Sequence, residues 1–140
     1  PFFLETLLPS TLLPFERPFV VAHEWSHLAG FTDEGEANFV AWLSCLRGDE
    51  GHQYSAWLSI YGEVLAAVPR TSQAELAQLL AQGPRADLQA IRLRLAREVS
   101  PRLSAAGWRA YDRYLKANRV DAGTASYAEV VQLILGTGIR

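Results

Sequence analysis

Two histidines and a glutamate form the pattern with the clearest chemistry in this chain. The stretch HEWSHLAG places His23 and His27 four positions apart, with Glu24 directly after the first histidine. On a helix, residues i and i+4 share a face, with their Cβ atoms about 5–6 Å apart. Two imidazoles so placed reach one ion at Zn–N distances of about 2.0–2.1 Å. The HExxH spacing therefore predicts a zinc site in which Glu24 takes a proton from a water activated by the metal.

A chance HExxH on an ordinary amphipathic helix is the alternative to a metal site. Residue usage gives such a match in well under about 1% of chains of this length. The apolar residues Val-Val-Ala before His23 supply a buried stem, and Gly30 ends the helix where the chain must turn back toward the metal. The context therefore favours the metal site.

A catalytic zinc needs a third protein ligand, and three carboxylates follow the histidines closely. Asp33 stands where metzincins carry their third ligand, but those enzymes also have a methionine turn, and this chain has no methionine. A gluzincin-like arrangement uses a glutamate on a second helix with a polar residue four positions later. Glu34 and Asn38 have that spacing, and Ala37 leaves room for close approach of the first helix.

Glu36 is the remaining carboxylate. At 100° per residue it points about 200° around the helix from Glu34, so both cannot bind one metal on a regular helix. We therefore expect Glu34 to be the third ligand, with Glu36 and Asp33 as alternatives. Asn38 is then placed to hydrogen-bond a ligand histidine.

Hydrolysis also needs a group that stabilises the oxyanion beside the metal. The candidates are Tyr54 and Tyr127, with His52 as a third. A tyrosine such as Tyr127, at the start of a helix, is more often a packing residue. His52 is more often an exposed loop histidine, because histidine is intermediate in burial.

The remaining aromatic and charged side chains have ordinary structural interpretations. Because they lie on amphipathic helices, the tryptophans are expected in the core; they are Trp25, Trp42, Trp57 and Trp108. The charges of residues 85–97 are expected to form a solvated face.

Apolar residues recur at helical spacing through most of the chain. Pro18 suits a first helical turn, Thr32 or Asp33 suits an N-cap, and no convincing alternating strand is present. The sequence predicts an all-α, compact bundle of about seven helices, with the HExxH helix packed against the EGEAN helix. The expected helices cover residues 18–30, 33–48, 49–68, 71–83, 86–100, 101–118 and 126–136.

Length and composition indicate one globular domain over residues 1–140. Apolar residues make up 49% and charged residues 20% of the chain, and the net charge of -2 gives no basic face for nucleic acid. Residues 1–17 form an apolar arm that Pro9 and Pro14 break, and residues 18–140 form the helical core. The chain starts at a proline and lacks methionine, so we expect a fragment of a longer protein.

The stretch HEWSHLAGFTDEGEANFVAWLSC resembles a family of uncharacterised bacterial membrane-anchored proteins, a domain of unknown function with the pattern HExAHxxGxxxExEANFxAxLxC. The likeness extends through HQYSAWL and YDRYLKANRVDAGTASYAEVVQLIL, and so covers most of the chain. The ExEAN piece is also similar to the ExxAN or ExxAD helix of ImmA/IrrE-type and HtpX-type metallopeptidases, in which the first glutamate would map to Glu34. The connection from Gly30 to Glu34 is shorter than in typical gluzincins.

The resemblance implies a zinc-dependent peptidase acting on a peptide or protein substrate. It also implies a membrane-associated bacterial full-length protein, anchored through upstream residues, of which this fragment is soluble. One alternative is a non-catalytic or inactive zinc module that binds a partner through its apolar N-terminal arm. It predicts a fourth protein ligand, whereas a catalytic site keeps one position open. Another alternative is a metal hydrolase that acts on a non-peptide bond.

Overall fold

The computed structural model describes residue 6, residues 8–98 and residues 129–138. This part of the chain forms six helices and no strand: α1 Arg17–Leu28, α2 Glu34–Leu46, α3 Glu50–Ala66, α4 Arg70–Leu79, α5 Gln82–Glu98 and α7 Glu129–Thr137. The all-α prediction is confirmed for the described residues. The structure shows six helices rather than about seven, and the helix expected over 101–118 lies outside the described residues.

The starts of α2 and α3 follow directly from their capping residues. Asp33 caps α2, with its side-chain oxygen accepting hydrogen bonds from the backbone N–H groups of Gly35 and Glu36 at 2.8 and 3.0 Å. Asp49 caps α3 in the same way through the N–H of His52, at 3.0 Å. Each carboxylate satisfies backbone donors that have no partner within the helix, and its charge suits the positive end of the helix.

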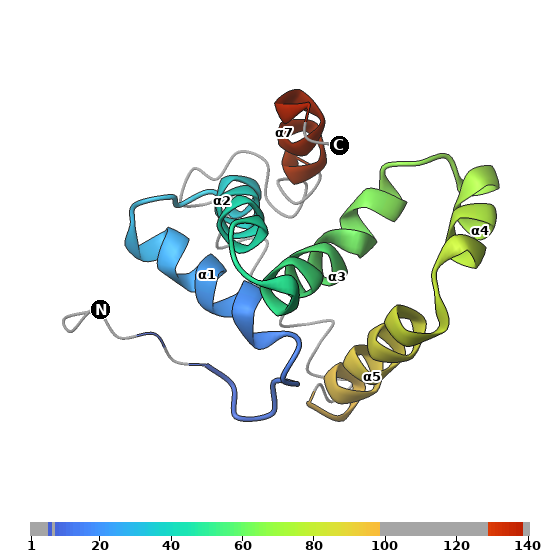
Figure 1. The fold of residues 1–140 in the computed structure, drawn as a ribbon, viewed down its shortest axis with the longest axis horizontal. Coiled ribbons are helices and arrows are strands. Elements are labelled where there is room, and N and C mark those ends of the chain that lie inside the picture. Colours follow the sequence, from blue (N-terminus) through green and yellow to red (C-terminus); the bar gives the residue numbers. More distant parts are fainter. Residues whose placement is uncertain (1–5, 7, 99–128, 139–140) are drawn as a thin grey trace, which may run out of the picture.

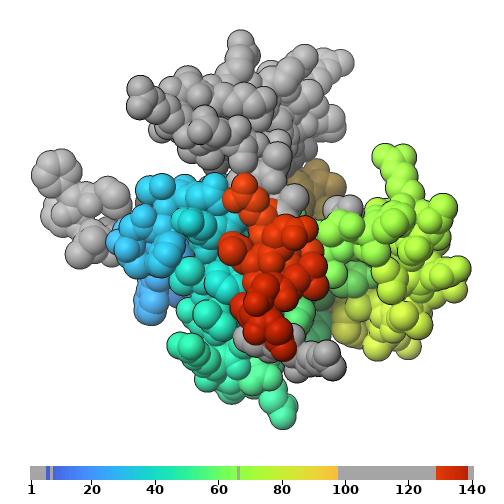
Figure 2. All heavy atoms as spheres, turned by 90° about the horizontal axis from the view of Figure 1, so that it is seen from above, coloured from blue at the N-terminus to red at the C-terminus, as the bar shows by residue number. Residues whose placement is uncertain are grey.

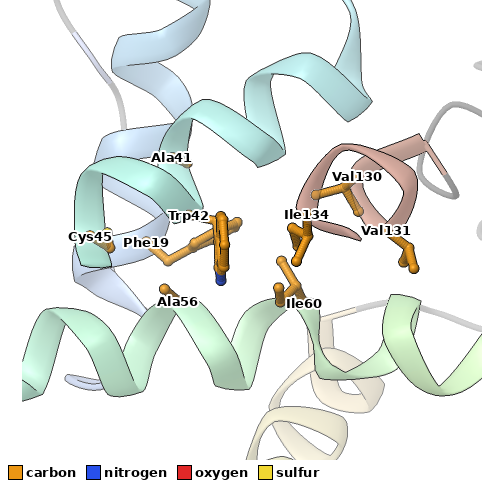
Figure 3. Packing of buried hydrophobic residues seen from close by; sticks show 9 residues of the cluster. All are labelled: Phe19, Ala41, Trp42, Cys45, Ala56, Ile60, Val130, Val131 and Ile134. Atoms are coloured by element: carbon orange, nitrogen blue, oxygen red, sulfur yellow. The ribbon is translucent and has the colours of Figure 1, made fainter. Parts of the chain in front are cut away.

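The core lies where α1, α2 and α3 pack together and α7 covers α2 and α3 (Figure 1). In the space-filling view, α7 (red) lies between α2 (cyan to green) and the α3–α4 region (green to yellow) (Figure 2). Trp42 is fully buried at the centre of the cluster (Figure 3). The buried cluster consists of Phe19, Ala41, Trp42, Cys45, Ala56, Ile60, Val130, Val131 and Ile134.

Two of the four tryptophans expected in the core are exposed. Trp25 is 63% exposed and Trp57 is 46% exposed. Trp57 packs its ring edge-on against Trp42, with centroids 5.3 Å apart, so only part of the Trp57 ring is covered. The prediction holds for Trp42, is wrong for Trp25 and Trp57, and lies outside the described residues for Trp108.

The α4–α5 hairpin, residues 70–98, extends away from this core (Figure 1). The Tyr54 hydroxyl on α3 donates to the Asp87 carboxylate on α5 at 2.5 Å. Arg94 donates to both carboxylate oxygens of Glu16, at 2.7 and 3.0 Å, and these side chains are 14% and 8% exposed. The sequence predicts a solvated face for all the charges of residues 85–97, and this prediction is wrong for Arg94. Arg94 ties α5 to the segment that leads into α1.

Only two residues in the described part of the expected apolar arm are buried: Leu12, which is 6% exposed, and Glu16. Residues 8–11 are exposed. None of the described helices is long and apolar enough to cross a membrane.

Candidate metal centre

The N-terminal half of α1 is fixed by contacts with both neighbouring helices. The Phe19 N–H in its first turn donates to the Ser55 hydroxyl of α3 at 3.1 Å, and Ser55 is fully buried. The Cys45 thiol of α2 donates to the Pro18 carbonyl at 3.6 Å, and burial raises the pKa of this thiol. Phe19 in turn stacks on the His23 ring, with centroids 6.3 Å apart. The position of α1 is thus set before any metal is considered.

The C-terminal end of α1 is closed by a glycine turn. Gly30 has a φ of 106°, a conformation that L side chains rarely adopt. Its N–H donates to the His27 carbonyl at 3.0 Å, and the Phe31 N–H donates to the Ser26 carbonyl at 3.1 Å. This pair of bonds is the Schellman arrangement. It confirms the expected helix end and directs the chain to Asp33, where α2 begins.

His23, His27 and Glu34 converge into one group that could hold a metal ion. The Nε2 atoms of His23 and His27 lie 3.1 Å apart. The Glu34 carboxylate oxygens lie 3.4 Å from the His23 Nε2 and 3.7 Å from the His27 Nε2. Donors about 2.0–2.1 Å from a tetrahedral ion are ~3.3 Å from one another. The residues therefore fit zinc in both chemistry and spacing.

Only Glu34, of the carboxylates considered, is brought to the histidines. Its side chain is 15% exposed, beside His23 at 17% and His27 at 28%. The Asp33 carboxylate is occupied in capping α2, and Glu36 lies exposed on the same helix. The metal group includes neither of them.

A backbone carbonyl orients one of the two histidines. The His27 Nδ1 lies 2.7 Å from the carbonyl oxygen of Phe31. Because a carbonyl oxygen can only accept, Nδ1 is the donor in this contact, which leaves Nε2 as the ring nitrogen that could bind a metal. This contact is a consequence of the Gly30 turn, which places Phe31 over the last turn of α1.

The hydrogen bond expected from Asn38 to a ligand histidine is not formed. Asn38 is buried, but the partner of the His27 Nδ1 is Phe31, and the buried His23 Nδ1 has no partner in the part of the chain that the structure describes. A backbone carbonyl acceptor cannot be recognised from the pattern of side chains, so the sequence analysis did not predict the contact with Phe31. The one available signal was Gly30, because a Schellman turn holds the residue after the glycine against the helix end through its N–H.

Glu24 is half-buried on α1, next to His23. Within residues 8–98 and 129–138 its carboxylate makes no hydrogen bond or ion pair. It is thus not committed to a structural partner there.

The other catalytic candidates are placed elsewhere or lie outside the described residues. The Tyr54 hydroxyl is engaged with Asp87, and burial together with that hydrogen bond raises the pKa of Tyr54 to about 12. His52 is half-exposed in the first turn of α3, where its Nδ1 lies 2.7 Å from the Asp49 carboxylate and lowers the pKa of Asp49. Tyr127 lies outside the described residues.

The comparison with protein families agrees with the resemblance to an uncharacterised domain. Residues 1–135 match the family described as "Protein of unknown function (DUF3810)". Neither a curated protein nor a solved structure gives a match. Because the match covers nearly the whole chain, this protein belongs to the DUF3810 family.

Proposed function

We propose that this protein is a zinc-dependent metallopeptidase, with His23, His27 and Glu34 as ligands and Glu24 as general base. The observation that carries the proposal is the convergence of those three donors at separations of 3.1–3.7 Å from two packed helices. Two imidazoles and one carboxylate are a ligand set of catalytic zinc sites, whereas structural sites have four protein ligands. The metal group in the described residues has three.

Each residue of the site has a defined task in this proposal. Zinc held by His23, His27 and Glu34 would supply the Lewis acidity that polarises a carbonyl and activates water. Glu24 accepts the proton of the attacking water and then delivers it to the leaving amine, so its carboxylate is restored at the end of the cycle. The Phe31 carbonyl holds His27 in the tautomer that a metal ligand requires.

The assignment to peptide bonds rests on the likeness of the ExEAN helix to the corresponding helix of gluzincin-like peptidases. The same ligands would also serve a hydrolase acting on another bond. Association of the full-length protein with a bacterial membrane, through upstream residues, rests on the resemblance alone.

Metal content is the first test, because the family itself has no assigned function. We expect about one zinc per chain in the wild type and in Glu24→Gln, and little in Glu34→Gln. Glu36→Gln is the matched control, because Glu36 lies exposed on the same helix. It should keep its zinc. Retention of zinc by Glu34→Gln would remove Glu34 from the ligand set.

Activity is then measured on a mixture of unstructured peptides, with products identified by mass. Glu24→Gln should keep its zinc and lose about 10²–10⁴-fold in rate, the usual contribution of a general base. Full activity of Glu24→Gln would contradict the proposed role. If the wild type binds no zinc, the alternative of a partner-binding module without catalysis becomes the better account.

A further inference from the structure

A second candidate binding site lies between α3 and the α4–α5 hairpin, and it involves none of the metal donors. One cavity, of about 240 Å³, is lined by one face of α3 together with Leu80 and Pro84. An adjoining cavity, of about 280 Å³, lies between α3, α4 and α5. Tyr61 and Leu80 line both. Because they share these two lining residues, the two cavities are here called together the hairpin cavity, and each is slightly smaller than the about 300–1,000 Å³ typical of ligand sites.

The first half of the hairpin cavity is apolar and aromatic. Trp57 and Val64 line it and are 46% and 38% exposed. Exposed apolar area of this kind favours an occupant that removes it from water. An aliphatic chain or an aromatic ring satisfies this half, and a strongly polar ligand does not.

Tyr61 lines both halves of the hairpin cavity. The Tyr61 hydroxyl is buried and has no hydrogen-bond partner among the described residues. A buried polar group without a partner costs free energy, which a ligand with an acceptor atom recovers. The position of Tyr61 in both cavities puts this polar contact where an apolar chain would meet a head group.

The second half of the hairpin cavity carries positive charge. Arg85 and Arg92 line it, and among the residues that the structure describes no aspartate or glutamate lines either cavity. The Arg85 Nη2 donates to the carbonyls of Ala77, Gln78 and Leu80, the last at 3.0 Å, which fixes its guanidinium at the end of α4. Two guanidinium groups without a carboxylate in the lining favour an anion with planar oxygens.

We propose that the hairpin cavity binds an amphipathic carboxylate of medium chain length. Its apolar chain lies against Trp57 and Val64, its carboxylate faces Arg85 and Arg92, and the Tyr61 hydroxyl donates to a carboxylate oxygen. This site goes beyond the proposed peptidase function and does not depend on bound zinc.

Octanoate is the probe, titrated into the purified chain and followed through the indole N–H signals in a ¹H–¹⁵N spectrum. The Trp57 indole signal should shift on saturation, and the signal of Trp25, which lines a different surface, should not. Octylammonium, which has the same chain length and the opposite charge, should bind at least about tenfold more weakly. Equal binding of the two probes, or equal shifts of both indoles, would overturn the proposal.

Three variants locate the contacts. Tyr61→Phe and Arg92→Gln should each weaken octanoate binding about tenfold. Tyr61→Phe keeps the ring and removes a hydroxyl without a partner, so it should fold as the wild type does. Arg97→Gln, an exposed arginine on the same helix that does not line the hairpin cavity, should bind octanoate normally. Unchanged affinity in both Tyr61→Phe and Arg92→Gln, or absence of octanoate binding, would reject the site.

Discussion

The α1–α2 pair and the α4–α5 hairpin are held in the molecule by different kinds of contact. Buried side chains from α1 and α2, including Phe19 and Trp42, meet α3 residues in one cluster. The α4 helix contributes no buried residue, and Leu79 at its end is 81% exposed. The hairpin is linked instead by the Tyr54–Asp87 hydrogen bond and the Arg94–Glu16 ion pair.

This difference indicates which region can support which kind of site. Metal donors must be held at fixed separations, and a close-packed core provides that rigidity. Regions with few buried apolar contacts open at lower free-energy cost than the core does. The α1–α2 pair therefore suits a preorganised metal centre, whereas the hairpin suits a cavity that a ligand enters and leaves.

The largest effect is expected when a fully buried side chain is removed from the hydrophobic core. Trp42→Ala removes a fully buried side chain and should lower the free energy of unfolding by about 3–5 kcal/mol. Zinc binding should be lost with the fold. Trp25→Ala, at a residue 63% exposed, should change stability by less than about 0.5 kcal/mol. Urea unfolding measures both, and similar losses in the two variants would contradict the assignment of the core.

A smaller effect, confined to the hairpin, is expected when its ion pair is broken. Arg94→Gln leaves the Glu16 carboxylate largely buried without its cation and should cost about 3 kcal/mol. Proteases should cut residues 70–98 faster in this variant, while its zinc content stays unchanged. Arg97→Gln on the same helix is the control. If Arg94→Gln loses zinc as well as protease resistance, the two regions unfold together.

A more local effect is expected from the turn that ends α1. Gly30→Ala strains a backbone at φ 106°, although an added Cβ would meet no atom within 4 Å. Loss of the Phe31 carbonyl contact should weaken zinc binding about 10–100-fold, as for other groups that orient metal ligands.

Gly138→Ala is a matched control for this change. Gly138 also has a positive φ, of 64°, and open space around an added Cβ, but it follows α7. It should bind zinc normally. Equal weakening in Gly30→Ala and Gly138→Ala, measured by competition with a chelator, would mean that general strain and not the carbonyl explains the effect.

The smallest effect concerns pH and α3, the helix that both regions share. Burial raises the pKa of Glu63 above its ordinary value of 4.5, so the folded state holds this proton more tightly than the unfolded state does. The free energy of unfolding should therefore fall as the pH rises from 4.5 through the raised pKa of Glu63. Glu63→Gln should therefore have a slightly higher Tm than wild type at pH 7 and no advantage at pH 4. The exposed Glu75→Gln is the control, and an equal gain from it would refute burial as the cause.

The local features of the metal centre could be predicted from sequence because they lie close together in the chain. HExxH fixes the helical spacing of His23 and His27, Gly30 marks the end of the helix, and Asp33 marks the start of the next one. With both helix boundaries set, the short connection leaves Glu34 in the first turn of α2, facing the histidines.

Features that depend on distant parts of the chain could not be predicted in the same way. Arg94 looked like one of many surface charges, because its partner Glu16 is 78 positions away. Trp25 and Trp57 sit on amphipathic helices, but which stripe of each helix is covered depends on where the neighbouring helices pack. The pattern gives the periodicity of a helix and leaves its orientation open.

The three candidate metal donors all come from the single short stretch between His23 and Glu34, and this has a kinetic consequence. Closing a loop of about ten residues takes roughly 10–100 ns, whereas contacts between distant segments must wait for larger loops to close. Two adjacent helices and the turn between them are enough to assemble the donors, before α7 arrives from the other end of the chain. Zinc supplied at the start of refolding is therefore expected to act as a nucleus for the α1–α2 pair and to shorten the folding time.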